Sequence, residues 1–450
     1  MSSPLSIARQ LLQRSFGHAE FRPLQSRIIH HVLCGRDVLA VLPTGGGKSL
    51  CFQVPALAAN QLTVVVSPLI ALMQDQVAAL TLRQVPAAAI NSTQDAATQA
   101  AIIADALAGR IRLLYLSPER LTRFADEYTG RGGRVARLAV DEAHCIVEWG
   151  HDFRPSYRGI ARARTALGDP PCIALTGSAT PAVRREIRRA LGFRDDHREI
   201  VGSFDRPNLR FDVIQVSGRD ERASRMVRLV RATDGACIVY APTRGIVEGI
   251  TRTLIEHGVD AAPYHAGMSP AERSGVLERF IADRASVVVA TCAFGMGIDK
   301  AAVRLVVHWS MPATPESYYQ EAGRAGRNRA PARCVLLHHP GDAVLPRRQL
   351  ATTFPSERLL EQLWRDPSLR LRQPASVVAA ADRLSAELRP DRGSVDWRRI
   401  RRRRREAARR IDVMINYART RSCRRRHLLG WFGERVERCS GCDRCTPTPP

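Results

Sequence analysis

Short apolar runs rich in β-branched residues recur along most of the chain, and longer amphipathic stretches separate them. In the first 180 residues the runs are DVLAVLP, LTVVVSP, RLLYLSP, LAVDEA and CIALTG; between residues 236 and 339 they are ACIVYAP, SVVVATC, RLVVHWS and RCVLLHH. Uninterrupted apolar runs suit strands buried on both faces, and helical spacers between them favour parallel pairing. The sequence therefore predicts an α/β fold with two parallel-sheet lobes.

This pattern divides the 450 residues into four parts. We expect a first lobe over residues 1–205, a second lobe over 206–339, a helical Arg-rich subdomain over 340–445 and a disordered tail over 446–450. Pro207 interrupts the periodicity between the lobes, and strand-like runs stop after Pro340. Short helices are predicted in PSERLLEQLW and PASVVAAADRLSAEL, and a long helix over roughly 396–421.

Positive charge dominates the composition. The chain has 68 Lys and Arg against 44 Asp and Glu, and Lys48 and Lys300 are its only lysines, which leaves 66 arginines. A surplus of this size indicates a polyanionic partner, most often nucleic acid. The alternative is an Arg-rich surface set by genome composition. The densest basic block is WRRIRRRRREAARR (Trp397–Arg410).

The cysteines and the apolar runs bear on the compartment. No run reaches the roughly 18 residues of a membrane span, and the N-terminus lacks the layout of a signal peptide. We therefore expect a cytoplasmic protein without a membrane partner. Seven of the 11 cysteines lie in apolar surroundings and are expected to be reduced core residues, whereas four crowd the C-terminal end. Clustered cysteines in a cytosolic chain indicate a metal site rather than disulfides.

The segment LPTGGGKS (Leu42–Ser49) lies between a predicted strand and a predicted helix. Its three glycines allow backbone N–H groups to converge on phosphate oxygens, and the helix N-terminus adds positive charge. Lys48 supplies a compact cation for the β- and γ-phosphates, and the Ser49 hydroxyl can bind Mg²⁺. The spacing departs from the full phosphate-loop pattern, because Pro43 replaces the first glycine. The alternative is a Gly-rich turn before a helix.

Acidic and basic groups that suit nucleotide hydrolysis occur farther along. Asp141 and Glu142 end an apolar strand, where Asp141 can hold Mg²⁺ through water and Glu142 can orient and deprotonate the attacking water. Arg324 and Arg327, from the second lobe, are candidate arginine fingers for the γ-phosphate. The alternatives are a solvated acidic loop and a basic surface helix.

Taken together, these motifs resemble those of superfamily 2 helicases, and specifically the RecQ family of DNA helicases. The likeness covers roughly residues 10–340 and 411–445, through FGHAEFRPLQ, LPTGGGKS, VVSPLIALMQDQV, DEAHC, ALTGSATP, VVVATCAFGMGIDK and ESYYQEAGRAGR. It implies two RecA-like lobes with ATP and Mg²⁺ between them, and adenine contacts from Arg22 and Gln25. The implied nucleotide-binding residues are Arg22, Gln25, Thr44, Gly45, Gly46, Gly47, Lys48, Ser49 and Gln320. Departures include Leu24 for a usual glycine, LTGSAT for LTATA and GRNR for GRDG.

The segment HCIVEWGHDFRPSY (His144–Tyr157) resembles the aromatic-rich loop of that family. Aromatic faces stack on unpaired bases of any identity, and a loop that follows the acidic pair can report strand occupancy to it. The alternative is a core Trp and Phe beside a salt bridge. The residues that the resemblance assigns to DNA are Trp149, His151, Asp152, Phe153 and Arg154.

The four C-terminal cysteines follow the spacing C-x15-C-x2-C-x2-C, and the CRRRHLLGWFGE that opens the cluster is typical of the same family. Four thiolates suit tetrahedral Zn²⁺, and a site with four protein ligands is structural because no position stays open. We expect the zinc to fix the long helix to the second lobe. The expected ligands are Cys423, Cys439, Cys442 and Cys445.

The resemblance implies an ATP-dependent DNA helicase that moves 3′-to-5′ on single-stranded DNA in recombination and repair. It would act as a monomer on single-stranded DNA and on tailed or junction duplexes. Two alternatives are an RNA-dependent ATPase and a non-catalytic zinc protein that binds DNA. Because the family's winged-helix and C-terminal helical domains have no counterpart before Pro450, we expect a short form whose sequence constrains ATP hydrolysis more than strand separation.

Overall fold

The computed structural model describes residues 4–43, 45–59, 61–147, 154–295, 300–388 and 395–446. The chain forms two compact units, Met1–Phe204 and Asp205–Pro450. Trp149, His151, Asp152, Phe153 and Thr44, which the sequence assigned to DNA and nucleotide, lie outside the described residues.

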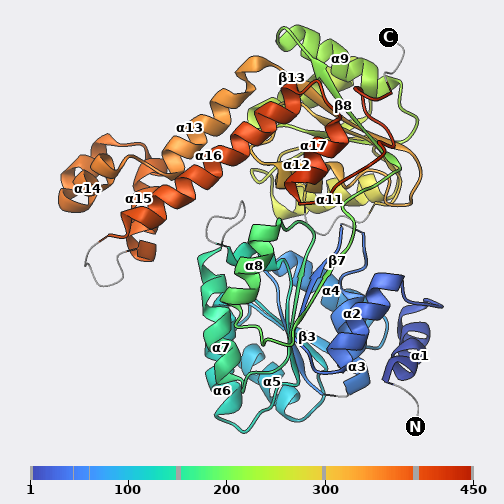
Figure 1. Cartoon of the computed structure of the whole chain (residues 1–450), viewed down its shortest axis with the longest axis vertical. Helices are drawn as coiled ribbons and strands as arrows, with labels where there is room; N and C mark the ends of the chain where they lie inside the picture. The colour runs from blue at the N-terminus through green and yellow to red at the C-terminus, as the bar shows by residue number, and fades with distance from the viewer. Residues whose placement is uncertain are drawn as a thin grey trace. The chain divides into compact units, whose positions relative to one another are not determined.

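Within its described residues, the first unit is built on a seven-stranded sheet in the order β3-β4-β2-β5-β6-β1-β7, with parallel pairing throughout. The strands are β1 (Val38–Val41), β2 (Thr63–Val66), β3 (Ala87–Ile90), β4 (Leu113–Leu116), β5 (Arg137–Val140), β6 (Cys172–Thr176) and β7 (Arg198–Val201). The helices are α1 (Pro4–Phe16), α2 (Pro23–Leu33), α3 (Leu50–Ala59), α4 (Ile70–Thr81), α5 (Ala96–Leu107), α6 (Pro118–Thr129), α7 (Ile160–Ala166) and α8 (Pro181–Ala190). Helices flank the sheet on both faces (Figure 1), which explains why central strands such as β2 and β4 are buried at every position.

The described part of the second unit contains a six-stranded parallel sheet in the order β10-β11-β9-β12-β13-β8. Its strands are β8 (Leu209–Gln215), β9 (Ala236–Tyr240), β10 (Ala261–Tyr264), β11 (Val287–Ala290), β12 (Val303–His308) and β13 (Ala332–His338). The helices that accompany them are α9 (Arg219–Arg231), α10 (Arg244–Glu256), α11 (Pro270–Ile281), α12 (Pro315–Ala322) and α17 (Arg424–Trp431). The expected fold class, with two parallel-sheet lobes, is confirmed.

A helical arm belongs to the second unit. It consists of α13 (Val344–Thr353), α14 (Glu357–Arg365), α15 (Ala375–Leu388) and α16 (Trp397–Arg419). Helices α13 and α16 contact each other and lead away from the strands of this unit, with α14 and α15 packed at the far end (Figure 1). A small apolar cluster that includes Leu360, Leu363, Leu384 and Ile400 holds this end together.

Four strands that the sequence analysis did not name are present: β3, β7, β8 and β10. Their sequences explain the omission, since AAAI and AAPY contain few β-branched residues, and the first two residues of β7 are exposed. Within the described ranges, no helix is long and apolar enough to cross a bilayer.

Candidate nucleotide site and zinc cluster

The start of α2 positions two side chains against the glycine loop of the first unit. Arg22 donates from Nη1 to the Gly45 carbonyl oxygen at 2.5 Å. Gln25 donates from Nε2 to the carbonyl oxygens of Gly46 (3.3 Å) and Gly47 (3.1 Å), while its Oε1 accepts from the Arg22 backbone N–H at 2.9 Å. These two residues therefore fix the loop, and their expected contacts with adenine stay a prediction.

Two positions of the loop require glycine. Gly47 has a φ of +72°, and a Cβ atom there would lie 2.3 Å from the Gln25 side-chain nitrogen. At Gly46 a Cβ atom would lie 2.8 Å from the backbone oxygen of Pro43. A side chain at Gly46 would clash with the backbone of the loop itself, and at Gly47 it would strain the backbone and displace the Gln25 side chain, so the loop retains its shape only with glycine.

The end of this loop offers free backbone donors. Helix α3 begins at Leu50, and in the part of the chain that the structure describes no backbone oxygen accepts from the N–H groups of Lys48, Ser49 or Leu50. Free N–H groups at a helix start, with a lysine among them, fit the phosphates of a nucleotide. The expected role of the Ser49 hydroxyl as a magnesium ligand stays a prediction.

Asp141 and Glu142 follow β5 at the carboxyl edge of the sheet. Burial and the neighbouring Glu142 raise the pKa of Asp141 to about 6, and Lys48 acts in the opposite direction, which places its ammonium within electrostatic reach. A divalent cation would offset the repulsion between the two carboxylates. The residues present therefore fit Mg²⁺, with Asp141 and Ser49 as the groups that would hold it.

A chain of close polar contacts leads from the acidic pair to the next strand. Glu142 has a left-handed backbone (φ 45°), and its Oε2 lies 3.2 Å from His144 Nδ1. That ring nitrogen is 3.0 Å from the Thr176 hydroxyl at the end of β6, and the same hydroxyl accepts from the Ser178 N–H. The LTGSAT segment, which departs from the family sequence, is thus in contact with the DEAH segment.

The C-terminal end of the aromatic-rich segment is anchored beside the same edge. Tyr157 donates its hydroxyl to the Asp141 carbonyl oxygen at 3.0 Å, and Arg154 donates to the Pro68 carbonyl oxygen at 2.8 Å. Pro68 belongs to the VVSPLIALMQDQV segment. Arg154, expected to bind DNA, therefore connects two motif segments of the first unit.

The remaining catalytic candidates belong to the second unit. Gln320 lies on α12, and Arg324 and Arg327 lie in the turn that follows it.

The sequence analysis missed two side chains that shape the turn after α12. Arg206 donates to the carbonyl oxygens of residues 323, 325 and 326, and Asn208 to those of residues 326 and 330, at 2.8–3.1 Å. Both flank Pro207, the residue that marked the junction between the lobes.

The four C-terminal cysteines converge, as their spacing predicted. The Sγ atoms of Cys423, Cys439, Cys442 and Cys445 all lie within 4.8 Å of one another. Tetrahedral zinc with bonds of about 2.3 Å needs sulfurs roughly 3.8 Å apart, so the cluster fits Zn²⁺. The cluster also borders the sheet, because Cys442 pairs with Phe211 on the edge strand β8.

Two fully buried arginines connect the cysteine loop to the rest of the second unit. The sequence analysis singled out neither of them. Arg424 forms a two-pronged ion pair with Asp443 (3.0 and 3.1 Å) and donates to the Tyr417 carbonyl oxygen. Arg425 pairs with Asp205 and donates to the carbonyl oxygens of Arg206 and Leu209.

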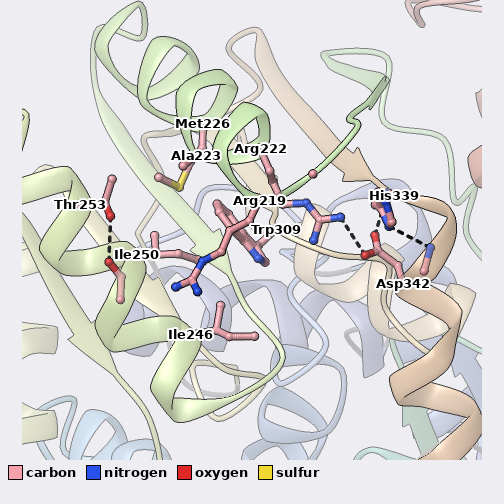
Figure 2. Close-up of a pocket in the computed structure, with 13 residues that line it drawn as sticks. Arg219, Arg222, Ala223, Met226, Ile246, Ile250, Thr253, Trp309, His339 and Asp342 are labelled. Atoms are coloured by element: carbon pink, nitrogen blue, oxygen red, sulfur yellow. Dashed lines mark hydrogen bonds and ion pairs between the residues drawn. The ribbon is translucent and has the colours of Figure 1, made fainter.

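A pocket of about 410 Å³ opens on the second unit between α9, α10 and the segment after β13 (Figure 2). Figure 2 shows Arg222 pointing toward Asp342, to which it is ion-paired at 2.8 Å, while Arg219 extends between α9 and α10. The Arg222 guanidinium also lies 5.5 Å from the centre of the Trp309 ring. This ion pair connects α9 to the start of the helical arm.

Comparison with known proteins agrees with this arrangement. The family described as DEAD/DEAH box helicase matches residues 22–189, Helicase conserved C-terminal domain matches 204–329, and RecQ zinc-binding matches 391–446. Among solved structures, Mycobacterium smegmatis helicase Lhr bound to ssDNA and AMP-PNP aligns with a TM-score of 0.59 at 22% identity, covering 78% of this chain and 50% of that one. The fold and the site thus define a two-lobed helicase core.

Curated relatives narrow the class. The chain is 38% identical to the ATP-dependent DNA helicase RecQ of Bacillus subtilis, over 99% of this chain and 68% of that protein. The corresponding protein of Haemophilus influenzae is 37% identical, over 98% of this chain and 64% of the relative. This chain belongs to the RecQ family of helicases, as its motifs predicted.

The chain spans 62–68% of the length of the RecQ relatives from H. influenzae, Pasteurella multocida and B. subtilis. The zinc expectation is likewise confirmed, by the RecQ zinc-binding match and the four clustered thiols.

Proposed function

We propose that the chain is an ATP-driven DNA motor that moves along a single strand and unwinds duplex DNA. The observation that carries this proposal is the site on the first unit. There the N–H groups of Lys48, Ser49 and Leu50 have no backbone acceptor among the described residues, and Lys48 lies within electrostatic reach of Asp141. Lys48 and the N–H groups would bind the phosphates, Asp141 and Ser49 would hold Mg²⁺, and Glu142 would deprotonate the attacking water. Bound Mg²⁺ would supply charge neutralisation on the phosphate oxygens.

Glu142, the proposed base, is connected by contacts to the aromatic-rich segment (His144–Tyr157). Its contact with His144 continues to Thr176, and Tyr157 contacts the backbone of Asp141 from the far side of the aromatic-rich segment. A change in that segment on binding a strand would shift the acidic pair through these contacts. We infer that DNA stimulates hydrolysis by this path, with Trp149 and Phe153 stacking on bases.

Arg324, Arg327 and Gln320 complete the proposed site from the second unit. Guanidinium groups that approach the γ-phosphate stabilise the charge of the transition state. Closure of the two units around ATP and reopening after hydrolysis would then move the protein along a strand held mainly by its phosphates. By analogy with the family we propose 3′-to-5′ travel, action as a monomer, a cytoplasmic location, and roles in recombination and repair on tailed or junction DNA.

The first test is Lys48→Ala. Loss of the ammonium removes the positive charge from the phosphates in the transition state, so we expect DNA-stimulated phosphate release to fall by at least about 100-fold. Affinity for single-stranded DNA should stay within about twofold, because the loop contacts the nucleotide and not the strand. Lys48→Arg should also fail, because a planar guanidinium does not fit a space shaped for an ammonium.

The control is Arg27→Ala, which removes one positive charge from an exposed position on α2. It should hydrolyse ATP as the wild type does. Turnover retained by Lys48→Ala would refute the site, and stronger stimulation by RNA than by DNA strands of the same sequence would favour the RNA-dependent alternative. A wild-type chain that binds DNA without turnover would leave only the non-catalytic alternative.

A further inference from the structure

The solvent face of α16 carries a row of arginines. Arg398, Arg402, Arg405 and Arg409 follow one another at intervals of four, three and four residues, and all four are exposed. Intervals of three and four place side chains on one face of a helix. With a rise of 1.5 Å per residue, this arginine stripe is about 16 Å long.

The opposite face of α16 is fixed to the protein. Its buried residues include Ile400, Arg403 and Met414, and Arg403 forms an ion pair with Glu387 at 2.6 Å in which both side chains are 5% exposed. Asp396 caps the N-terminus by accepting from the Arg399 N–H. The stripe therefore presents its charges from a held backbone.

Acidic residues neutralise only one of these four arginines. The helix has ten arginines but only two acids, Glu406 and Asp412, and these pair with Arg409 (3.7 Å) and Arg347 (3.3 Å). In the part of the chain that the structure describes, no carboxylate pairs with Arg398, Arg402 or Arg405. Like charges three and four residues apart repel and destabilise a helix, so an ordinary solvated helix alternates its signs.

The side chains around the arginine stripe indicate which kind of ligand it binds. No aromatic residue lies between Arg398 and Arg409 along the helix. Two tryptophans lie nearby: Trp397 is stacked on Trp364 with ring centres 5.7 Å apart, and the Arg409 guanidinium covers the Trp431 ring at 5.3 Å from its centre. Binding of a single strand relies on stacking platforms, and the two tryptophan rings nearest this face are already covered by other side chains. A membrane-surface helix would need a free apolar face, whereas the apolar face of α16 is buried within its own protein.

We propose that Arg398, Arg402 and Arg405 bind the phosphate backbone of duplex DNA next to the single strand on which the motor acts. A duplex carries one charge per about 1.7 Å of its axis, so these three arginines, which span about 10 Å of the helix, face about six phosphate charges. That the ligand is DNA rests on the proposed function, whereas the position of the three arginines is known from the structure of the helical arm. Helices α13, α14 and α15 of that arm lie between the matched helicase and zinc-binding domains, whereas α16 lies within the residues that match the zinc-binding domain.

The test compares two triple variants in duplex binding without nucleotide, from 50 to 300 mM salt. In Arg398→Gln/Arg402→Gln/Arg405→Gln we expect the slope of log affinity against log salt to shrink by about 2.7, since each lost phosphate contact removes about 0.9. Affinity for a blunt duplex at 50 mM salt should fall at least about tenfold.

The matched control removes the same charge elsewhere on the second unit. Arg228, Arg231 and Arg252 are exposed residues of α9 and α10, and their triple change to Gln should leave the slope unchanged. Lysines at the three stripe positions should retain most of the duplex affinity, because phosphate contacts need charge more than the guanidinium shape. Circular dichroism and zinc content should report that all variants are folded.

Several outcomes would overturn the proposal. If both triple Gln variants lost duplex affinity equally, the net charge of the protein alone would explain duplex binding. Equal loss of affinity for a single strand of the same length would remove the preference for duplex, and loss of binding to phosphatidylserine vesicles with duplex affinity kept would assign the stripe to a membrane surface. Because no ATP is present, these binding measurements do not depend on hydrolysis. If the protein did not hydrolyse ATP but its affinity for duplex DNA still depended on the three arginines, only the proposed function would be refuted.

Discussion

Arginine in this chain is a structural residue as well as a surface charge. Arg164, Arg410, Arg424 and Arg425 are each at most 3% exposed. Their guanidinium groups have five N–H donors in a planar fork, which allows one side chain to satisfy a carboxylate and several carbonyl oxygens together. The role that we propose for Lys48 is of the opposite kind, because a phosphate loop suits a compact ammonium on a flexible stem.

Arg425→Lys tests this view at the residue scale. A lysine retains the charge but cannot reach Asp205 and the carbonyl oxygens of Arg206 and Leu209 at once, so buried acceptors lose their donors. We expect a loss of about 2–4 kcal/mol in the unfolding free energy of the second unit. Zinc should also transfer faster to a chromogenic chelator, because α17 holds the cysteine loop against β8. Arg421→Lys, an exposed neighbour, is the control, and equal release rates in the two variants would contradict the expectation.

Elements of the first unit are joined by one buried carboxylate. Asp37, which precedes β1 and is 0% exposed, accepts from Arg164 (2.8 Å), from the Cys172 N–H at the start of β6 (2.7 Å) and from the Arg194 N–H (2.9 Å). Burial alone would raise the pKa of Asp37, but the hydrogen bonds from Arg194, Cys172 and Arg164 lower it below the usual value. The charged form is therefore the one that the fold stabilises.

Asp37→Asn should cost the first unit about 3 kcal/mol at pH 7, since two arginines lose their buried partner. Because the folded pKa is lowered, the stabilisation is complete above the unfolded value near 3.9 and is lost as the pH falls through the folded value. The stability gap between wild type and variant, measured by urea unfolding, should therefore be constant down to about pH 5 and should shrink below pH 4.

Asp105→Asn provides the comparison, because its pair with Arg110 is half exposed. It should cost less than about 1 kcal/mol. A gap for Asp37→Asn that does not change with pH would show that shape, and not charge, is what the fold requires there.

At the scale of the whole molecule, the proposed site has contributors from two compact units. Arg327→Ala should lower the rate of hydrolysis by about 10³-fold while leaving ATP binding nearly intact, because an arginine finger acts in the transition state. Arg329→Gln, two residues on and exposed, should hydrolyse normally.

Small-angle scattering tests the closure itself. We expect the radius of gyration to fall when AMP-PNP, Mg²⁺ and a single strand are added to the wild type, and to stay constant for Lys48→Ala. A scattering curve that does not respond to nucleotide in the wild type would contradict the motor mechanism, whatever the rate of hydrolysis.

The sequence by itself determined the fold class, the family and the positions of the phosphate loop and the cysteine cluster. These features are local: β-branched runs define buried strands, and a loop such as Leu42–Ser49 or a C-x2-C-x2-C spacing bears its chemistry within a few residues. The residues of the candidate site could be named for the same reason, although Trp149, His151, Asp152 and Phe153 lie outside the described part and stay predictions.

Only the tertiary structure decided which distant residues hold these features in place. The Arg22 and Gln25 contacts with the loop, the Arg206 and Asn208 contacts with the arginine turn, and the Asp205–Arg425 pair join residues 20 to 220 positions apart. Sequence patterns report periodicity along the chain, whereas a buried guanidinium is satisfied by carbonyl oxygens that the fold brings together. The exposed face of α16 was likewise decided by packing. It buried some of the arginines of this helix and left Arg398, Arg402 and Arg405 on the other side, where no carboxylate of the described residues pairs with them.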